Sequence, residues 1–338
     1  MLKVEKLTER QIETLNIVIK SYIQWGEARG SRSLKDQFRV DFSPATLRNT
    51  MSELEGMGYL THLHASGGKI PTYKGYRYYV ENLLNINDNK PVVFLHFKQP
   101  HTKEISKLLK NVAYEISNIA QCISITFFNL TPFVKLKKIS FVKLNENEIL
   151  SIVASNIGGV ESKIVCTEAS FSQSQLNDFS EYLSKNYYNW RIKDIRKDLL
   201  NNILSHENEC KKLFLKVVED CNEREIYIAG QKNMLSYQEF IEDIDRLKRL
   251  LSTLEKKKDI LKLLEKITKE ENPAIIIGEE NPMEELHLTS IIAAPYLLED
   301  DMVGVFSIIG PLHMNYEKII RLVSGTSKKI SMFLDEGV

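Results

Sequence analysis

The chain has 338 residues, of which 43% are hydrophobic and 27% are charged, with 45 basic side chains balanced by 45 acidic ones. This globular profile suits two or three domains, and no apolar run is long enough for a membrane-spanning helix. The charged start argues against a secretory signal, and the four scattered cysteines form neither a disulfide framework nor a zinc signature, so we expect a cytoplasmic protein.

The charge is unevenly distributed along the chain. Residues 1–80 contain 12 Lys and Arg against 8 Asp and Glu, whereas the remainder contains 33 against 37. A basic head on an acidic body favours a nucleic-acid partner, because neutralised phosphates drive affinity. The bias is small and does not establish DNA binding on its own.

The start of the chain carries clear helix signals. Thr8 and Gln11 form a capping box ahead of a periodic apolar run, and Gly26 ends the helix that they begin. After a short turn, Ser31 is placed to cap a second, shorter helix that ends near Phe38.

A third helix, at 44–57, has the pattern of a recognition helix. Ser43 caps it, and its apolar side chains share one face, which leaves the opposite face polar. A hairpin follows, with strands at 59–64 and 69–72, and a fourth helix comes after it. Three helices and a hairpin in this order are typical of a winged helix-turn-helix domain, which we expect over residues 1–85.

Beyond a polar linker, strand-like and helical segments alternate. β-branched runs form one group between 123 and 155 and a second between 274 and 309, whereas the residues between the groups are mainly helical and highly charged. This pattern predicts an α+β protein in which residues 90–157 and 273–338 form one α/β domain, interrupted by an insertion at 158–272.

One stretch of the insertion has heptad spacing. Its apolar positions are Phe240, Ile244, Leu247, Leu251 and Leu254. The stretch covers only about two heptads, fewer than a coiled coil needs. Two interpretations remain open: a helix packed on its own domain, or a helix at a dimer interface.

Five segments in chain order resemble motifs of the HrcA family of heat-inducible transcription repressors. They are GSRSL (30–34), SPATLRNTMSELEGMGYL (43–60), SGGKIPTYKGYRYYV (66–80), IIGEE (276–280) and IIGPLHMNY (308–316). The resemblance spans the chain and implies a winged helix, a GAF-like domain and a dimerisation domain inserted within it. It also implies a homodimer that binds an inverted-repeat operator, represses chaperone operons at normal temperature and depends on the chaperonin for its activity.

The sequence departs from this family pattern at several positions. Thr50 stands where many relatives have Asp, Ala28 and Arg29 stand where they have Pro and Val, and Lys69 replaces an Arg in the wing. Thr50 is expected to face the core. Lys69 keeps the charge without the planar fork of Arg, so we expect phosphate contact from the wing rather than groove reading.

The winged-helix interpretation assigns roles on DNA. In the N-terminal part of the recognition helix, Arg48 suits guanine, Asn49 suits adenine, and Ala45 or Thr46 suits a thymine methyl group. The remaining candidates are expected to contact or closely approach the DNA backbone: Ser31, Arg32, Ser43, Ser52, the wing residues Ser66, Gly67, Gly68 and Lys69, and the flanking Lys74 and Arg77.

These assignments have alternatives. Arg48 pairs with Glu55 or Asp41 in one of them, Asn49 and Arg77 are simply solvated in another, and the two wing glycines are needed by the turn itself. His62 and His64 alternate on one strand like metal ligands, but no third ligand is near, so we expect no metal.

Two other classes of function are an effector-binding regulator and an enzyme. A GAF-like domain that binds a small-molecule effector is the main alternative, although Gly158-Gly159 is equally well explained as a turn. The chain lacks the phosphate-binding, dinucleotide-binding, zinc-protease and nucleophile-elbow motifs of common enzymes. We therefore expect no catalysis and no cofactor.

Overall fold

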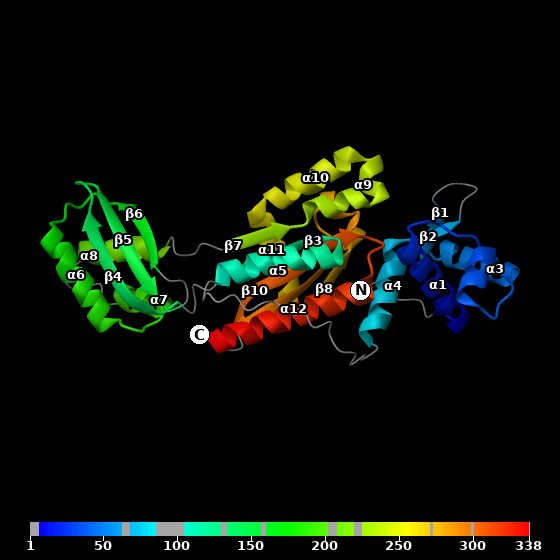
Figure 1. Ribbon diagram of the computed structural model, residues 1–338, viewed down its shortest axis with the longest axis horizontal. Helices are drawn as coiled ribbons and strands as arrows, with labels where there is room; N and C mark the ends of the chain where they lie inside the picture. Colours follow the sequence, from blue (N-terminus) through cyan, green and yellow to red (C-terminus); the bar gives the residue numbers. More distant parts are fainter. Residues whose placement is uncertain are drawn as a thin grey trace.

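The computed structural model describes residues 7–62, 68–85, 105–129, 134–156, 160–201, 208–219, 225–270, 273–298 and 301–337. These residues form a mixed α/β structure in which helices pack on antiparallel sheets. Figure 1 shows three parts in a row. We call them the N-terminal part (7–85), the central part (105–129 and 225–337) and the inserted part (134–219).

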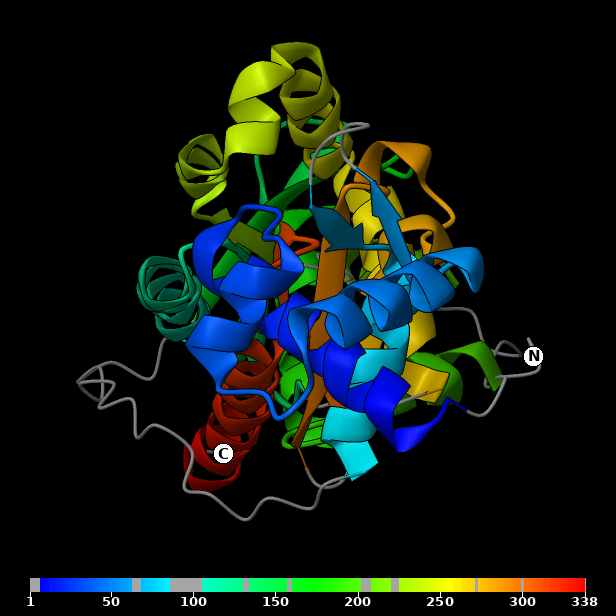
Figure 2. The ribbon, with the colours of Figure 1, turned by 90° about the vertical axis from the view of Figure 1, so that its right-hand side faces the viewer.

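The N-terminal part contains four helices and one hairpin. Thr8 and Gln11 make the predicted capping box, and Gly26, with φ 71°, ends the first helix in the left-handed region that glycine favours. The elements follow the predicted order: α1 (Glu9–Trp25), α2 (Ser31–Phe38), α3 (Pro44–Gly56), β1 (Leu60–His62), β2 (Lys69–Pro71) and α4 (Tyr73–Asn85). Seen from this end, its blue helices lie in front of the central sheet (Figure 2).

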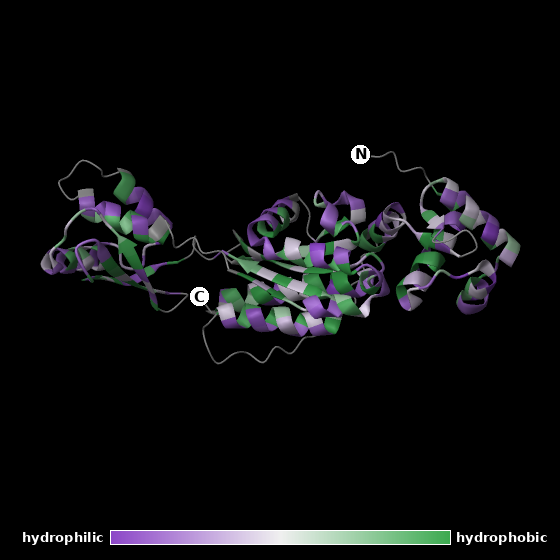
Figure 3. Cartoon of the chain, turned by 90° about the horizontal axis from the view of Figure 1, so that it is seen from above, coloured by the Kyte–Doolittle hydropathy of each residue, from purple (hydrophilic) through white to green (hydrophobic). Residues whose placement is uncertain are grey.

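The central part is built on a five-stranded antiparallel sheet in the order β7-β3-β10-β9-β8. Its strands are β3 (Ile123–Phe128), β7 (Glu225–Ala229), β8 (Ala274–Ile277), β9 (Thr289–Leu298) and β10 (Asp301–Pro311). Alternate residues of these strands are apolar towards each face, so the strands are largely green in Figure 3 and each face can bury a helical layer.

Helices cover both faces of this sheet. The core on one face contains residues of α5 (Ile105–Ala120) and α12 (Tyr316–Gly337). The core on the other face contains residues of α9 (Gln238–Glu242), α10 (Ile244–Glu255) and α11 (Lys257–Glu270). None of the helices in the described ranges is both long enough and apolar enough to cross a membrane.

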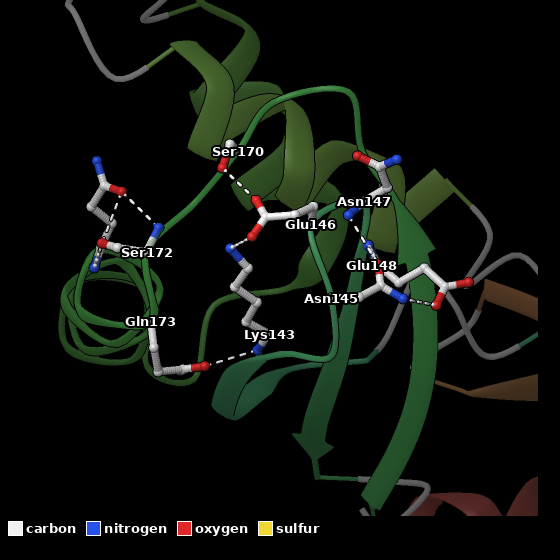
Figure 4. Close-up of polar contacts among 9 residues, drawn as sticks. Lys143, Asn145, Glu146, Asn147, Glu148, Ser170, Ser172 and Gln173 are labelled. Carbon is white, nitrogen blue, oxygen red and sulfur yellow. Dashed lines mark hydrogen bonds and ion pairs between the residues drawn. The ribbon is translucent and has the colours of Figure 1, made fainter.

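The inserted part has a sheet and a core of its own. The sheet order is β4-β5-β6, with β4 (Leu136–Lys143), β5 (Glu148–Ser155) and β6 (Val160–Cys166), and three helices complete the part: α6 (Gln173–Asn186), α7 (Ile192–Asn201) and α8 (Asn208–Glu219). Figure 4 shows how its β4–β5 turn is tied to the start of α6. The Lys143 backbone N–H donates to Gln173, while Glu146 accepts hydrogen bonds from the Lys143 ammonium and from Ser170, which lower the pKa of Glu146.

The insertion occupies a different stretch from the one that the sequence pattern indicates. Residues 134–156 were assigned to the split domain, but β4 pairs with β5, and β5 pairs with β6 on its other side. Residues 225–270 were assigned to the insertion, but β7 pairs with β3 and the helices after it pack on the central sheet. The reason is that a β-branched run does not indicate which of the two sheets its strand joins. A charged helix that buries only one stripe of apolar residues also gives no sign in the sequence of the sheet on which it packs.

The heptad residues lie mostly in this central core. Phe240, Leu247 and Leu254 are buried against the sheet, Leu251 is half-buried, and Ile244 is 58% exposed. The stretch is also not one helix, because α9 ends before Asp243, which caps α10. Packing within the same chain thus accounts for the three buried positions.

Candidate nucleic-acid interface

Helix α3 presents a polar face to solvent. Leu47, Met51 and Leu54 are buried on its inner side, which fixes the helix against the core of the N-terminal part. The candidate reading residues Ala45, Arg48 and Asn49 are exposed on the outer side, and Ser52 continues the same face. The sequence-derived orientation of this helix is therefore the one observed.

Arg48 and Asn49 are both exposed on this face. Within the ranges that the structure describes, neither side chain makes a hydrogen bond or an ion pair. Glu55, the expected alternative partner of Arg48, instead contacts Lys69 and His62. Two donors that are able to read base edges are thus exposed together and not engaged elsewhere.

The start of α3 is held by hydroxyl groups. Ser43 Oγ accepts the Thr46 backbone N–H at 3.0 Å, and the two side-chain hydroxyls are 2.8 Å apart. Thr50 is buried and donates to the Thr46 carbonyl at 3.1 Å, so it faces the core as expected. The caps leave the N-terminal turn of the helix well defined at the surface.

Lys69 lies inside the N-terminal part rather than on the outer side of the hairpin. Its Nζ is 2.9 Å from Glu55 Oε2 and donates to Ser52 Oγ at 2.8 Å, and its side chain is only 8% exposed. Ser52 in turn donates to the Arg48 carbonyl at 3.1 Å. The structure therefore engages both residues in internal contacts, where the sequence suggested phosphate contacts.

The hairpin also approaches the turn between α1 and α2. A Cβ atom on Gly68 would lie 2.8 Å from the Arg29 carbonyl oxygen, which is too close for any other residue without movement. Close packing therefore explains Gly68 without DNA. The other two wing candidates, Ser66 and Gly67, lie outside the described residues. Of the candidates in α2, Arg32 is exposed and Ser31 is half-buried.

Lys74 and Arg77 both face the protein. Lys74 Nζ donates to the Met57 carbonyl at 2.8 Å and lies 4.3 Å from the centre of the Tyr59 ring. Arg77 donates to both carboxylate oxygens of Glu280 and, at 2.7 Å, to the Ile275 carbonyl. The expected contact of these two residues with flanking DNA is therefore replaced by internal bonds, within the N-terminal part for Lys74 and to the central part for Arg77.

Aromatic contacts complete this junction between the N-terminal and central parts. The Tyr22 ring meets His313 edge to face at 5.5 Å, and His313 Nδ1 is 3.2 Å from Glu239. Tyr76 lies 5.6 Å from Tyr316, and burial raises the pKa of both phenols. The sequence did not reveal this junction, since its partners are about 200 positions or more apart along the chain.

The described part of the chain offers little for a metal ion or for catalysis. Its His, Cys, Asp and Glu side chains form no cluster suited to a metal ion. An open groove of about 760 Å³ lies between α5, β7 and α10, with Tyr114, Tyr227 and Leu251 in its lining. The groove brings together no set of titratable groups that would suggest catalysis.

Comparison with known proteins points to one family. The model of the HrcA protein C-terminal domain matches residues 106–320. The heat-inducible transcription repressor HrcA of Thermodesulfovibrio yellowstonii is 29% identical over 98% of this chain and 99% of its own length. The protein of that name in Syntrophobacter fumaroxidans is also 29% identical, over 98% of each chain. A crystal structure of a hypothetical protein shares the fold, with a TM-score of 0.70 at 19% identity, and covers 98% of this chain and all of its own.

Proposed function

Since the chain belongs to the HrcA family of heat-inducible transcription repressors, we propose that it represses transcription by placing α3 in the major groove of an inverted-repeat operator. The observation that carries this proposal is the exposed polar face of α3, on which Arg48 and Asn49 have no partner in the described residues. Its relatives are named as repressors and not as enzymes, and this chain is likewise not an enzyme.

We assign the N-terminal part as a winged helix and the central part as a GAF-like domain. The hairpin β1–β2 lies next to α3, as a wing lies beside a recognition helix. In the proposed complex, Arg48 reads guanine, Asn49 reads adenine, and Ala45 or Thr46 contacts a thymine methyl group. Ser31, Arg32 and Ser43 remain the candidates for phosphate.

The test of this assignment is a titration of labelled DNA. The probes are an inverted-repeat duplex selected from a random library and an unrelated duplex of equal length. Asn49→Ala should lose about 1–3 kcal/mol of discrimination with little change in salt dependence, because a base contact is removed and no phosphate contact is lost. Gln24→Ala, at an exposed position of α1, is the matched control. Unchanged discrimination in Asn49→Ala would rule out the proposed placement of α3 on the DNA.

A second copy of the chain is the proposed partner, because a two-fold operator is matched by a two-fold protein. The inserted part offers a suitable surface. Its sheet packs one face on its own core, while the other face carries Val142, Val160 and Ile164, all exposed. The strand register places Val142, Leu150 and Ile164 side by side across the sheet. An apolar patch of this kind suits a dimer contact better than the largely buried heptad residues.

Substitution separates the two dimer surfaces. Ile164→Lys should convert the dimer to a monomer in light scattering, since it places a charge in an apolar contact. Ile244→Lys, the exposed heptad position, is the matched control and should leave the dimer intact. A monomer for Ile244→Lys and a dimer for Ile164→Lys would place the dimer interface at α10 instead.

Two further aspects of the function rest on the family relationship. We propose that the protein acts in the cytoplasm and that the chaperonin maintains its active form. Refolded protein should then regain operator binding faster with chaperonin and ATP than without them. The alternative of an effector-regulated repressor draws support from the groove beside β7. It requires a metabolite that raises the thermal stability of the protein and changes operator affinity at fixed temperature.

A further inference from the structure

We infer that Lys69 is a positioning residue that does not itself contact the DNA backbone. It locks the hairpin onto α3 and thereby aims the exposed face of α3 that carries Arg48 and Asn49, which we call the reading face. The inference deepens the proposed function and rests on it. It replaces the most direct interpretation of a wing lysine, which is a positive charge held out to a phosphate.

Both strands of the hairpin are tied to one carboxylate. His62 on β1 and Lys69 on β2 are direct cross-strand partners. His62 Nε2 lies 3.1 Å from Glu55 Oε1, and Lys69 Nζ lies 2.9 Å from Glu55 Oε2. Because each oxygen of Glu55 holds a different strand, the hairpin cannot rotate on α3 without breaking at least one of these contacts.

The same lysine connects to the reading face through Ser52. Lys69 Nζ donates to Ser52 Oγ, which donates its own proton to the Arg48 carbonyl one turn earlier. The single hydroxyl proton of Ser52 is thus already used and is not available to a phosphate. The chain of contacts runs from the hairpin to the backbone of the residue proposed to read guanine.

The burial of Lys69 decides whether this residue is a structural link between the hairpin and α3 (a strut) or a phosphate contact. The Lys69 side chain is only 8% exposed, so its charge needs partners, and here Glu55 and Ser52 supply them. To reach a phosphate, Lys69 would have to leave both partners, and the Glu55 carboxylate would then lie beside the DNA without its lysine. The close approach of Gly68 to the Arg29 carbonyl holds the hairpin from the other side and opposes that movement.

The two interpretations predict opposite results for Glu55→Gln in the full-length protein. If Lys69 contacts phosphate, removing the nearby negative charge should strengthen binding to selected and unrelated duplexes alike. If Lys69 is a strut, Glu55→Gln weakens binding to the selected inverted repeat about three- to tenfold and leaves the unrelated duplex nearly unchanged. Tighter binding by this variant would overturn the inference.

Lys69→Met provides the second measurement, because it keeps an unbranched side chain, one atom shorter, and removes its charge. We expect a loss of at least about tenfold for the selected duplex, with an unchanged slope of log affinity against log salt. A phosphate contact would instead lower that slope by about 0.9 and weaken both duplexes equally. The double variant Lys69→Met/Glu55→Gln should lose less than the sum of the two single losses, since both changes break the Lys69–Glu55 contact.

Controls separate this inference from the proposed function and from misfolding. Lys20→Met removes an exposed lysine of α1 and should have little effect on discrimination. Thermal melting identifies any variant that fails to fold, and Glu55→Gln, at a partly exposed position, then decides the question by the sign of its effect. If the wild-type protein does not prefer any inverted repeat, the proposed function fails; if it does but Glu55→Gln binds more tightly, only the strut fails.

Discussion

Single residues in this protein are defined as much by what they touch as by their chemical type. Arg48, Lys69 and Arg77 are all cations in the N-terminal part, yet only Arg48 is exposed without a partner in the described residues. Lys69 holds two secondary-structure elements together, and Arg77 holds two parts of the molecule together. Their contributions to DNA binding should therefore differ in kind.

Cys122 gives a residue-scale prediction for alkaline pH. Burial raises the pKa of its thiol from 9.0 to about 11, although a hydrogen bond with Tyr237 opposes the shift. The unfolded chain loses this proton near pH 9 while the folded chain keeps it, so the free energy of unfolding should fall between pH 9 and 11. The loss from this group is about 2–3 kcal/mol.

Chemical denaturation across that pH range measures the effect. Cys122→Ala should flatten the part of the decline that belongs to this thiol, whereas Cys166→Ala, at an exposed position, should leave the curve as it is. An equally steep curve for Cys122→Ala would assign the decline to the buried tyrosines, whose pKa values are also raised by burial.

The sequence predicted local features of residues well and distant partners poorly. The caps at Thr8 and Ser43 and the outward direction of Arg48 depend on neighbours three or four positions away, so spacing is enough to find them. Glu55 is 14 positions from Lys69, and Glu280 is 203 positions from Arg77. No local pattern records such contacts, and both cations were therefore assigned to DNA.

At the scale of elements, the positions of helices and strands were predictable but their pairing was not. β3 and β7 are adjacent in the sheet although almost a hundred residues separate them along the chain. Periodicity identifies each as a strand, because it depends only on which side chains face the core. The choice of neighbour depends on a sheet that forms from distant segments, which is why the insertion was misplaced.

Glycines in strand and helix allow an element-scale prediction. A Cβ atom on Gly304 of β10 would lie within 2.5 Å of both the Phe127 carbonyl oxygen and the Tyr296 ring, whereas one on Gly56 of α3 meets nothing within 4 Å. Gly304→Ala should therefore destabilise the central part by about 1–3 kcal/mol through overpacking. Gly56→Ala should change stability little or raise it by up to about 1 kcal/mol, because alanine favours a helix.

Thermal denaturation of the two variants beside the wild-type protein measures this contrast. Amide hydrogen exchange then locates the loss, which should appear in β3, β9 and β10 for Gly304→Ala. Equal stability of the two variants would mean that β10 shifts freely, contrary to its pairing on both sides.

At the scale of the whole molecule, the junction between the N-terminal and central parts fixes the direction of the reading face. Arg77 and Glu280 form its charged contact, and the Tyr22–His313 and Tyr76–Tyr316 pairs form its aromatic contacts. The side chains of Arg77 and Glu280 are only about a quarter exposed. Solvent therefore screens this pair less than a surface ion pair.

Loss of the ion pair should make the repressor more sensitive to heat. Arg77→Ala is expected to weaken docking by about 1–3 kcal/mol, because it leaves the Glu280 carboxylate and the Ile275 carbonyl without this donor. Specific operator binding should then disappear at a lower temperature than in the wild-type protein. The check is a DNA titration at rising temperature, with amide exchange followed in α4 and β8.

Arg246→Ala is the matched control, since it breaks an exposed ion pair with Asp243 at the start of α10. It should leave the temperature of DNA release unchanged. If Arg77→Ala also leaves it unchanged, the junction is held by its aromatic contacts, and heat acts elsewhere in the molecule.

The strand register at the point where the inserted part leaves the central sheet has a consequence for evolution and for engineering. Phe128, at the end of β3, lies directly opposite Glu225, at the start of β7. The two ends are already neighbours, so a loop of about 2–5 residues, the usual length of a hairpin connection, would join them. The sheet is therefore compatible with a plain hairpin at this point, so that gain, loss or exchange of the inserted part between Phe128 and Glu225 leaves the pairing of β3 with β7 in place.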